Sequence, residues 1–272
     1  MDSDARRVRF AELHAGDALF VMPNPWDVGS ARLLASLGFD ALASTSQGFA
    51  WSLGKLDQQV SRDELVAHVR ELSDATALPL NVDSERCYPD APGGIAETVA
   101  LLAEAGGAGF SIEDYDSATG TIDDVGAATE RVAAAAEANR GLSTPMVLTG
   151  RAENYIHGFQ DLDDTIARLI AYRDAGADAV YAPGLTTIVQ IAAVVDALRC
   201  PVNVLAIAGV PSVAELAAAG VRRVSTGSAL ASRAYGALLS GASILRDAGT
   251  AAYAEGGLDR GAALAAFTSS GD

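Results

Sequence analysis

The chain has 272 residues, half of them hydrophobic, with 19 basic and 35 acidic side chains and a formal net charge of −16. This length suits a single α/β barrel, and the charge argues against nucleic acid or an anionic membrane as a partner, because phosphate binding needs clustered Lys and Arg. No stretch approaches the roughly 18–20 unbroken apolar residues of a membrane span, and the charged N-terminus lacks the apolar core of a signal peptide, so we expect a cytoplasmic protein.

Short apolar runs alternate with Ala- and Leu-rich amphipathic segments along the chain. The runs predict strands at 18–22, 41–45, 78–83, 109–113, 145–151, 178–183, 201–206 and 222–227. The segments between them predict helices at 27–37, 61–73, 93–105, 123–139, 161–175, 186–198, 212–219 and 228–247, and the tail predicts one or two more.

This alternation predicts a (β/α)8 TIM-type barrel, an α/β fold, as one domain over residues 1–272 with a C-terminal helical extension. The strands are continuously apolar rather than alternating, which suits a parallel sheet covered on both faces. A doubly wound open sheet is the alternative, but "MPNPWDVGS" after the first strand is not the expected GxGxxG turn.

Acidic side chains gather at the carboxyl ends of the second, third and fourth strands, where barrels place their active sites. The candidate metal ligands are Asp57, Asp83, Glu85 and Glu113. Carboxylates this close cannot all be ionised without a counter-charge, and oxygen donors without a His or Cys cluster favour Mg2+, with Mn2+ possible. Any one acid could instead be solvated or cap a helix, which is our expectation for Asp27 and Asp114.

Two further groups at these strand ends predict an anion-binding site. Arg151 ends the fifth strand and offers a planar fork for a carboxylate or phosphonate, although it could instead form a structural ion pair. The run Thr45-Ser46-Gln47-Gly48 offers backbone N–H and hydroxyl donors to a second anionic group. These residues predict a pocket for a small dianion that Asp83 also contacts, with Arg151 and Glu113 as catalytic residues. Mg2+ there would stabilise an enolate, as C–C or C–P cleavage beside a carbonyl requires.

The ordered motifs of the chain resemble the isocitrate lyase / phosphoenolpyruvate mutase superfamily over about residues 10–245. The motifs are "PNPWDVGSARLLASLGFDALASTSQGFAWSLGKLD", "NVDSE", "GFSIED", "LTGRAENYIHGFQDLDDTIAR" and "RRVSTGSAL". The resemblance implies an (α/β)8 barrel, often with the last helix swapped between subunits, in homodimers or homotetramers. It also implies Mg2+ held directly by Asp83 and mostly through water by the other three acids. Arg151 would grip the substrate beside the loop Thr45-Ser46-Gln47.

The loop after the fourth strand departs from the family pattern. Lyases of the family carry K-[KR]-C-G-H there, with a Cys that protonates the departing enolate, and phosphonate mutases use Lys and Asn. Here the loop reads "DYDSATGTIDD". We expect residues 114–123 to form a mobile flap, and the proton to come from water on the metal, from Tyr88 or from Cys87.

The function that these residues favour is a Mg2+-dependent lyase. It would cleave a C–C bond in, or decarboxylate, a small 2-oxo or 2-hydroxy carboxylic acid through a metal-stabilised enolate. The alternatives are a C–P bond enzyme of the phosphoenolpyruvate mutase or phosphonopyruvate hydrolase type, and a non-catalytic barrel that binds 2-oxo acids. A Schiff-base aldolase is nearly excluded, because the only lysine, Lys55, lies in a loop after the second strand.

Overall fold

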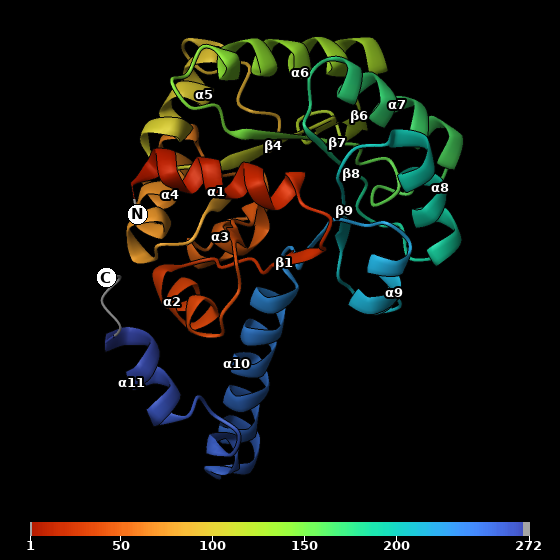
Figure 1. Cartoon of the computed structure of the whole chain (residues 1–272). Coiled ribbons are helices and arrows are strands. Elements are labelled where there is room, and N and C mark those ends of the chain that lie inside the picture. The colour runs from red at the N-terminus through yellow and green to blue at the C-terminus, as the bar shows by residue number, and fades with distance from the viewer. Residues whose placement is uncertain (1, 269–272) are drawn as a thin grey trace.

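A computed structural model describes residues 2–268, and at its centre an eight-stranded parallel sheet curls into a barrel (Figure 1). The strands are β1 (Phe20–Met22), β2 (Leu42–Ala43), β3 (Leu80–Asp83), β4 (Gly109–Glu113), β7 (Val147–Arg151), β8 (Ala179–Tyr181), β9 (Val202–Leu205) and β10 (Arg223–Ser225). Their order is β1-β10-β9-β8-β7-β4-β3-β2. The N–H of Ala43 donates to the carbonyl oxygen of Pro23 at 3.1 Å, so β2 returns to the end of β1 and nearly closes the barrel. The predicted fold is confirmed.

Helices cover the outside of this barrel (Figure 1). The predicted ones are α2 (Val28–Ser36), α4 (Arg62–Ala75), α5 (Gly94–Glu104), α6 (Val125–Arg140), α7 (Leu162–Asp174), α8 (Ile188–Leu198), α9 (Val213–Ala218) and α10 (Ala229–Ala248). Ser61, Thr187 and Ser212 cap three of them, each with a Glu or Gln three residues later that completes a capping box. Such local signals explain why the predicted ends agree with the observed ones to about two residues.

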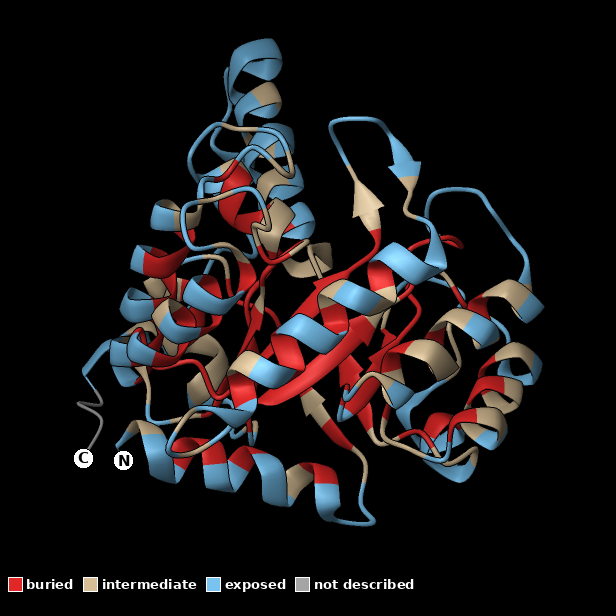
Figure 2. Ribbon diagram, turned by 90° about the horizontal axis from the view of Figure 1, so that it is seen from above, coloured by how far each residue is buried: buried red, intermediate tan, exposed pale blue. Residues whose placement is uncertain are grey.

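Four elements were not predicted at these positions. They are α1 (Ser3–Ala15), α3 (Ser46–Ser52) and a hairpin of β5 (Tyr115–Asp116) and β6 (Thr121–Ile122). In the tail, which was expected to be helical, the structure has η1 (Ala252–Ala254) and α11 (Arg260–Thr268). Figure 2 shows the buried strands in red at the centre, while the hairpin extends outward in tan and pale blue.

Helix α1 lies across the amino ends of the strands and closes the bottom of the barrel. Phe10 is fully buried in a cluster that includes Phe20, Met22 and Val147. Three consecutive edge-on ring contacts join Phe10, His14 and Phe20, with centroid distances between 4.5 and 6.1 Å. The aromatic side of α1 therefore fills the barrel end that the short strands leave open.

At mid-height the barrel interior is polar, and its centre is the buried side chain of Arg223. Its Nε donates to Asn203 Oδ1 at 3.0 Å and its Nη2 to Thr149 Oγ1 at 2.9 Å. Its Nη1 lies 3.0 Å from His14 Nε2. His14 Nδ1 lies 2.8 Å from the Phe10 carbonyl oxygen, so Nδ1 carries the proton and Nε2 accepts from Arg223. Burial and the neighbouring Arg223 lower the pKa of His14 to about 3, which keeps the ring neutral.

The last helices extend beyond the barrel. Most of α10 is exposed, including Leu238 and Leu239, and only Ala231 of this helix is buried. Helix α11 returns to pack against α2 (Figure 1). No helix within residues 2–268 is long and apolar enough to cross a membrane.

Candidate active site

A pocket of about 440 Å3 opens at the carboxyl ends of the barrel strands. It is lined by Thr45, Ser46, Gln47, Asp57, Asp83, Glu113 and Arg151 among the predicted site residues, and by Tyr115, Glu153, His157, Tyr181 and Leu205 among the others. Two predicted residues, Gly48 and Glu85, do not line it. Parallel pairing brings Glu113 opposite Arg151 and Arg151 opposite Tyr181, which is why residues far apart in the sequence meet here.

Arg151 is surrounded by carboxylates inside this pocket. Its Nη1 lies 2.6 Å from Asp83 Oδ1, and its Nη2 lies 3.2 Å from Glu113 Oε2 and 2.9 Å from Glu153 Oε1. Its guanidinium carbon also lies 5.2 Å from the centre of the Tyr181 ring. Burial acts to lower the pKa of Arg151, but the three carboxylates raise it well above the ordinary value. The guanidinium is therefore a permanent positive charge facing the pocket.

The acidic side chains around Arg151 outnumber the positive charges, and the pKa values of several of them are raised. Burial, with Asp83 and Asp57 adding to it, raises the pKa of Glu85 to about 8. Burial and Asp83 also raise the pKa of Asp57. Burial raises the pKa of Glu113 well above its ordinary value, although Arg151 opposes the shift. An additional cation at this place would allow these groups to ionise.

The donor set fits a hard divalent cation that keeps most of its water. Within residues 2–268 no group of three or more His, Cys, Asp or Glu side chains is arranged to hold a metal ion directly. A cage of direct carboxylate ligands is thus not preformed. Mg2+ is commonly held by one or two carboxylates and several waters, and it prefers oxygen donors. Asp83, Asp57 and Glu113 line the pocket as oxygen donors of this kind, and Glu85 lies behind them.

The run Thr45-Ser46-Gln47-Gly48 forms the start of helix α3 rather than an open loop. Thr45 is the N-cap and accepts the Gly48 N–H at 3.3 Å. The Ser46 N–H donates to Asp83 Oδ2 at 3.1 Å, and Gln47 Oε1 accepts from the Ser228 hydroxyl. Gly48 is buried, and a Cβ there would lie 2.6 Å from the Thr45 side chain and 3.1 Å from Trp26. Its role is close packing, whereas Thr45, Ser46 and Gln47 face the pocket.

Asp114, next to the predicted Glu113, supports the site from behind. It is fully buried, and its carboxylate accepts from the Glu153 N–H at 2.8 Å, the Tyr172 hydroxyl at 2.6 Å and Arg168 Nη1 at 3.2 Å. The expectation that Asp114 is solvated or caps a helix is wrong, because its partners come from the segment after β7 and from α7. Asp27, in contrast, is confirmed as the N-cap of α2.

Glu153 is a pocket residue that sequence reasoning missed. It is buried and lines the pocket, and its Oε1 accepts from Arg151 Nε at 2.9 Å. Burial raises the pKa of Glu153 to about 7, although Arg151 opposes the shift. The signal was present in "GRAEN", where Glu153 follows the predicted arginine by two residues, but only its contact with Arg151 in the structure shows that it turns inward.

The segment after β4 is a hairpin whose base is anchored. Arg86 pairs with Asp116 at 3.3 Å and with Asp123 at 3.1 Å, and Arg131 also pairs with Asp123. The tip, residues 117–120, is exposed, yet Ser117 lines the pocket. The hairpin therefore stands over the pocket, as expected of a flap, and its mobility stays a prediction.

The two side chains expected to supply a proton from the loop after β3 face away from this pocket. Cys87 is fully buried, and burial raises the pKa of its thiol to about 12. The Tyr88 hydroxyl donates to the carbonyl oxygen of Val60 at 3.2 Å. Neither residue lines the pocket, so the expectation that one of them could serve as the donor is wrong.

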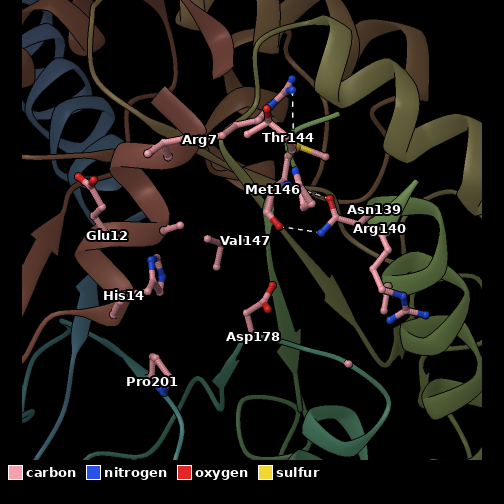
Figure 3. A pocket seen from close by; sticks show the side chains of 16 residues that line it. Arg7, Glu12, His14, Asn139, Arg140, Thr144, Met146, Val147, Asp178 and Pro201 are labelled. Carbon is pink, nitrogen blue, oxygen red and sulfur yellow. Dashed lines mark hydrogen bonds between the residues drawn. The ribbon is translucent and has the colours of Figure 1, made fainter. Parts of the chain in front are cut away.

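A larger pocket, of about 820 Å3, lies at the opposite end of the barrel (Figure 3). It is lined by α1, by the end of α6 and by residues that precede β7, β8 and β9. Figure 3 shows Asn139 of α6 hydrogen-bonded to Met146, with His14 of α1 and Asp178 on other sides. Because the amino ends of barrel strands contribute to stability rather than catalysis, we assign the active site to the acid-lined pocket.

The barrel, with its arginine-centred acid pocket at the carboxyl ends of the strands, defines an α/β-barrel enzyme. The family model "Phosphoenolpyruvate phosphomutase" matches residues 10–246. Oxaloacetate decarboxylase 2 of Pseudomonas fluorescens is 31% identical over 236 residues, covering 83% of this chain and 79% of that protein.

Two solved structures of similar proteins superpose on almost the whole chain. A Burkholderia cenocepacia protein, described only as a lyase/mutase, superposes with a TM-score of 0.93 at 47% identity, covering 99% of this chain and 98% of that one. Oxaloacetate acetylhydrolase in complex with the product oxalate superposes with a TM-score of 0.82 at 28% identity, covering 95% and 90%. The chain belongs to the phosphoenolpyruvate mutase family, and the predicted superfamily and lyase class are confirmed.

Proposed function

We propose that the protein is a Mg2+-dependent lyase that cleaves a C–C bond in, or decarboxylates, a small 2-oxo or 2-hydroxy carboxylic acid. The observation that carries this proposal is the placement of Arg151 among Asp83, Glu113 and Glu153 in one pocket, where three acids share one permanent cation. The likeness to an oxaloacetate decarboxylase and to an oxalate-bound acetylhydrolase supports a carboxylate substrate.

The residues divide into those that hold the cation and those that hold the substrate. Asp83 would bind Mg2+ directly, and Asp57, Glu85 and Glu113 would hold its waters. When bound, Mg2+ supplies the positive charge that stabilises an enolate. Arg151 would bind a substrate carboxylate with its fork, which a point charge cannot replace. Thr45, Ser46 and Gln47, at the start of α3, would receive the other anionic end with backbone N–H and hydroxyl groups.

Two further features would serve the reaction. The hairpin of β5 and β6 covers one side of the pocket and would limit access of water while the enolate exists. The apolar side chains of Ile156 and Leu205 line the pocket as well and would lower the local dielectric. The hairpin carries neither the Lys and Asn that phosphonate mutases use nor the Cys that lyases of the family use, so the proton donor would come from another part of the pocket.

The test is a substrate screen with a matched variant. We expect purified protein with Mg2+ to release a 2-oxo acid from at least one of oxaloacetate, methylisocitrate or 2,3-dimethylmalate, and EDTA to abolish the reaction. Arg151→Lys should lower kcat/KM by about 10²-fold or more, because the bidentate contact is lost. Phosphonopyruvate turnover instead would favour the C–P alternative. Tight binding of these acids without turnover would identify a binding barrel.

We also propose that the protein forms a homodimer or homotetramer. The supporting observation is the length of α10 that lies outside the barrel with exposed leucines, since monomers rarely expose large contiguous apolar patches. Light scattering with size-exclusion chromatography measures the mass directly. A monomer at micromolar concentration would contradict the proposal.

A further inference from the structure

Cleavage beside a carbonyl leaves an enolate carbon that must be protonated, so the proposed function requires a proton donor within the pocket. Asp83, Glu113 and Glu153 line the pocket but are ion-paired with Arg151. Tyr181 lies against the same guanidinium, and burial raises the pKa of its hydroxyl far above neutrality. Tyr181 therefore keeps its proton at neutral pH, and Asp83 and Glu113 are assigned to the cation. Glu153, although burial raises its pKa to about 7, is held against Arg151 Nε at 2.9 Å.

His157 is the pocket residue with the chemistry and the placement to do so. It follows β7 in the loop "ENYIHGF" and lines the pocket. Its ring stacks on Tyr115 of the hairpin, with centroids 3.5 Å apart and an interplanar angle of 11°. Its Nε2 lies 3.9 Å from Glu153 Oε2, and its side chain is 31% exposed. Tyr115 thus covers one face of the His157 ring, and Glu153 lies near its Nε2. The rest of the ring is partly open to solvent.

We infer that His157 is the catalytic residue that delivers the proton to the enolate carbon, an inference that rests on the proposed function. The C–C bond breaks and its electron pair enters the enolate. The other fragment leaves as CO2 from a 2-oxo acid or as a carbonyl compound from a 2-hydroxy acid, whose hydroxyl proton passes to water. As the enolate collapses to the ketone or carboxylate form, its carbon takes a proton from a ring nitrogen of His157. The imidazolium becomes neutral imidazole and regains a proton from water at its exposed edge. No oxidant or further reactant is needed.

The charges around His157 determine when the ring carries that proton. Glu153 and Asp114 are the acidic groups that face it, Arg151 is the cation, and Tyr115 covers its face. Burial lowers the pKa of His157 from its ordinary value, Asp114 opposes this, and Arg151 adds to it. A bound dianionic substrate brings negative charge that favours the imidazolium. Proton delivery should therefore weaken as pH rises above the pKa of this ring in the complex.

The hairpin acquires a second role from this arrangement. Tyr115 belongs to β5, and the base of the hairpin is held by Arg86 and Arg131 through Asp116 and Asp123. The stacked ring therefore keeps its orientation only while the hairpin is in place over the pocket. Tyr115 is a positioning residue for His157, and proton delivery is coupled to the covered state of the site.

The experiment follows exchange of the methyl protons of pyruvate with D2O by NMR, with Mg2+ present, in wild type, His157→Asn and His157→Gln. Exchange requires proton transfer at carbon without C–C cleavage, and pyruvate is the fragment that is protonated when oxaloacetate is decarboxylated. If the screen identifies methylisocitrate or 2,3-dimethylmalate instead, the exchange followed is that of the protons on C2 of succinate or propionate. Oxalate, which resembles an enolate but has no carbon to protonate, measures binding in the same samples by calorimetry. We expect both variants to lose about 10²–10⁴-fold in exchange rate while the oxalate Kd stays within about threefold. Imidazole added to His157→Ala should restore part of the exchange.

Several results would overturn the role of His157 as proton donor. Exchange within about threefold of wild type in both variants would overturn the inference. Loss of oxalate binding together with exchange would make His157 a binding residue and also overturn it. Abolition of exchange by Tyr115→Phe, with His157 variants still active, would assign the proton to the phenol. If wild type neither binds oxalate nor turns over any acid of the screen, the proposed function fails and takes this inference with it.

Discussion

Asp114→Ala should be among the most destabilising single substitutions in this protein. The carboxylate is buried and accepts from the Glu153 N–H, the Tyr172 hydroxyl and Arg168. Removing it leaves the Tyr172 hydroxyl and the Glu153 N–H without this acceptor, which costs about 1–3 kcal/mol each, and takes one of two carboxylates from Arg168. These contributions overlap, so we expect the free energy of unfolding to fall by about 3–5 kcal/mol.

Asp164 provides a matched control, because it pairs with Arg168 as Asp114 does. Asp164 pairs with Arg168 at 2.7 Å, but its side chain is 44% exposed, whereas that of Asp114 is 1% exposed. Because exposed ion pairs contribute about 0–1 kcal/mol, Asp164→Ala should lose about 1 kcal/mol or less. Urea unfolding followed by circular dichroism compares the two variants with wild type. Equal losses in both variants, or a loss below about 1 kcal/mol for Asp114→Ala, would refute the reasoning from burial.

Three further predictions concern the acids and the cysteine beside the pocket. Asp83→Ala should abolish Mg2+ binding in calorimetry while the barrel stays folded, and Glu113→Gln should weaken it by about 10–100-fold; wild-type affinity in Asp83→Ala would mean that the metal lies elsewhere. Because the pKa of Glu85 is raised from 4.5 to about 8, the metal-free protein binds an extra proton relative to the unfolded chain between these values. Its stability should therefore fall as pH rises from about 5 to 8, and Glu85→Gln should flatten that slope in urea titrations. Buried Cys87 should resist iodoacetamide at pH 8 in the native protein, as mass spectrometry would show, and Cys87→Ser should keep most of the activity.

The pattern of apolar and capping residues along the sequence was sufficient to predict most of the barrel, because each of these strands and helices is specified by residues close to it in the chain. Helix α1 was missed because its apolar side, Phe10 above all, is interrupted by charged residues that read as a solvated terminus. Helix α3 was missed because Ser46 and Gly48 are weak helix formers, and the cap on Thr45 fixes the turn only when Gly48 packs against Trp26. In both cases a contact outside the segment decides its structure.

In the candidate site, too, some features could be predicted from the nearby sequence and others depend on distant contacts. The acids at strand ends could be placed from the sequence, because parallel strands deliver their carboxyl ends to one edge. The direction of each side chain could not. Asp114 and Glu113 are neighbours, yet one faces the pocket and the other binds Tyr172, which lies 58 residues away in the chain. Cys87 and Tyr88 follow the acid pair but have positive φ angles of 62° and 48°, and this turn points them away from the site.

The bond between His14 and Arg223 joins residues 209 positions apart, and β1 pairs in register with β10 among the described strands. Ribosomes add about 5–20 residues per second, so on the order of 10–40 s separate the synthesis of these two partners. During that interval β1 lacks the strand with which it pairs in register, and the ring of His14 lacks the buried guanidinium that it contacts. A nascent chain that ends before β10 therefore presents the unpaired edge of β1 to chaperones and proteases. The first residues to leave the ribosome are among the last to reach their native places.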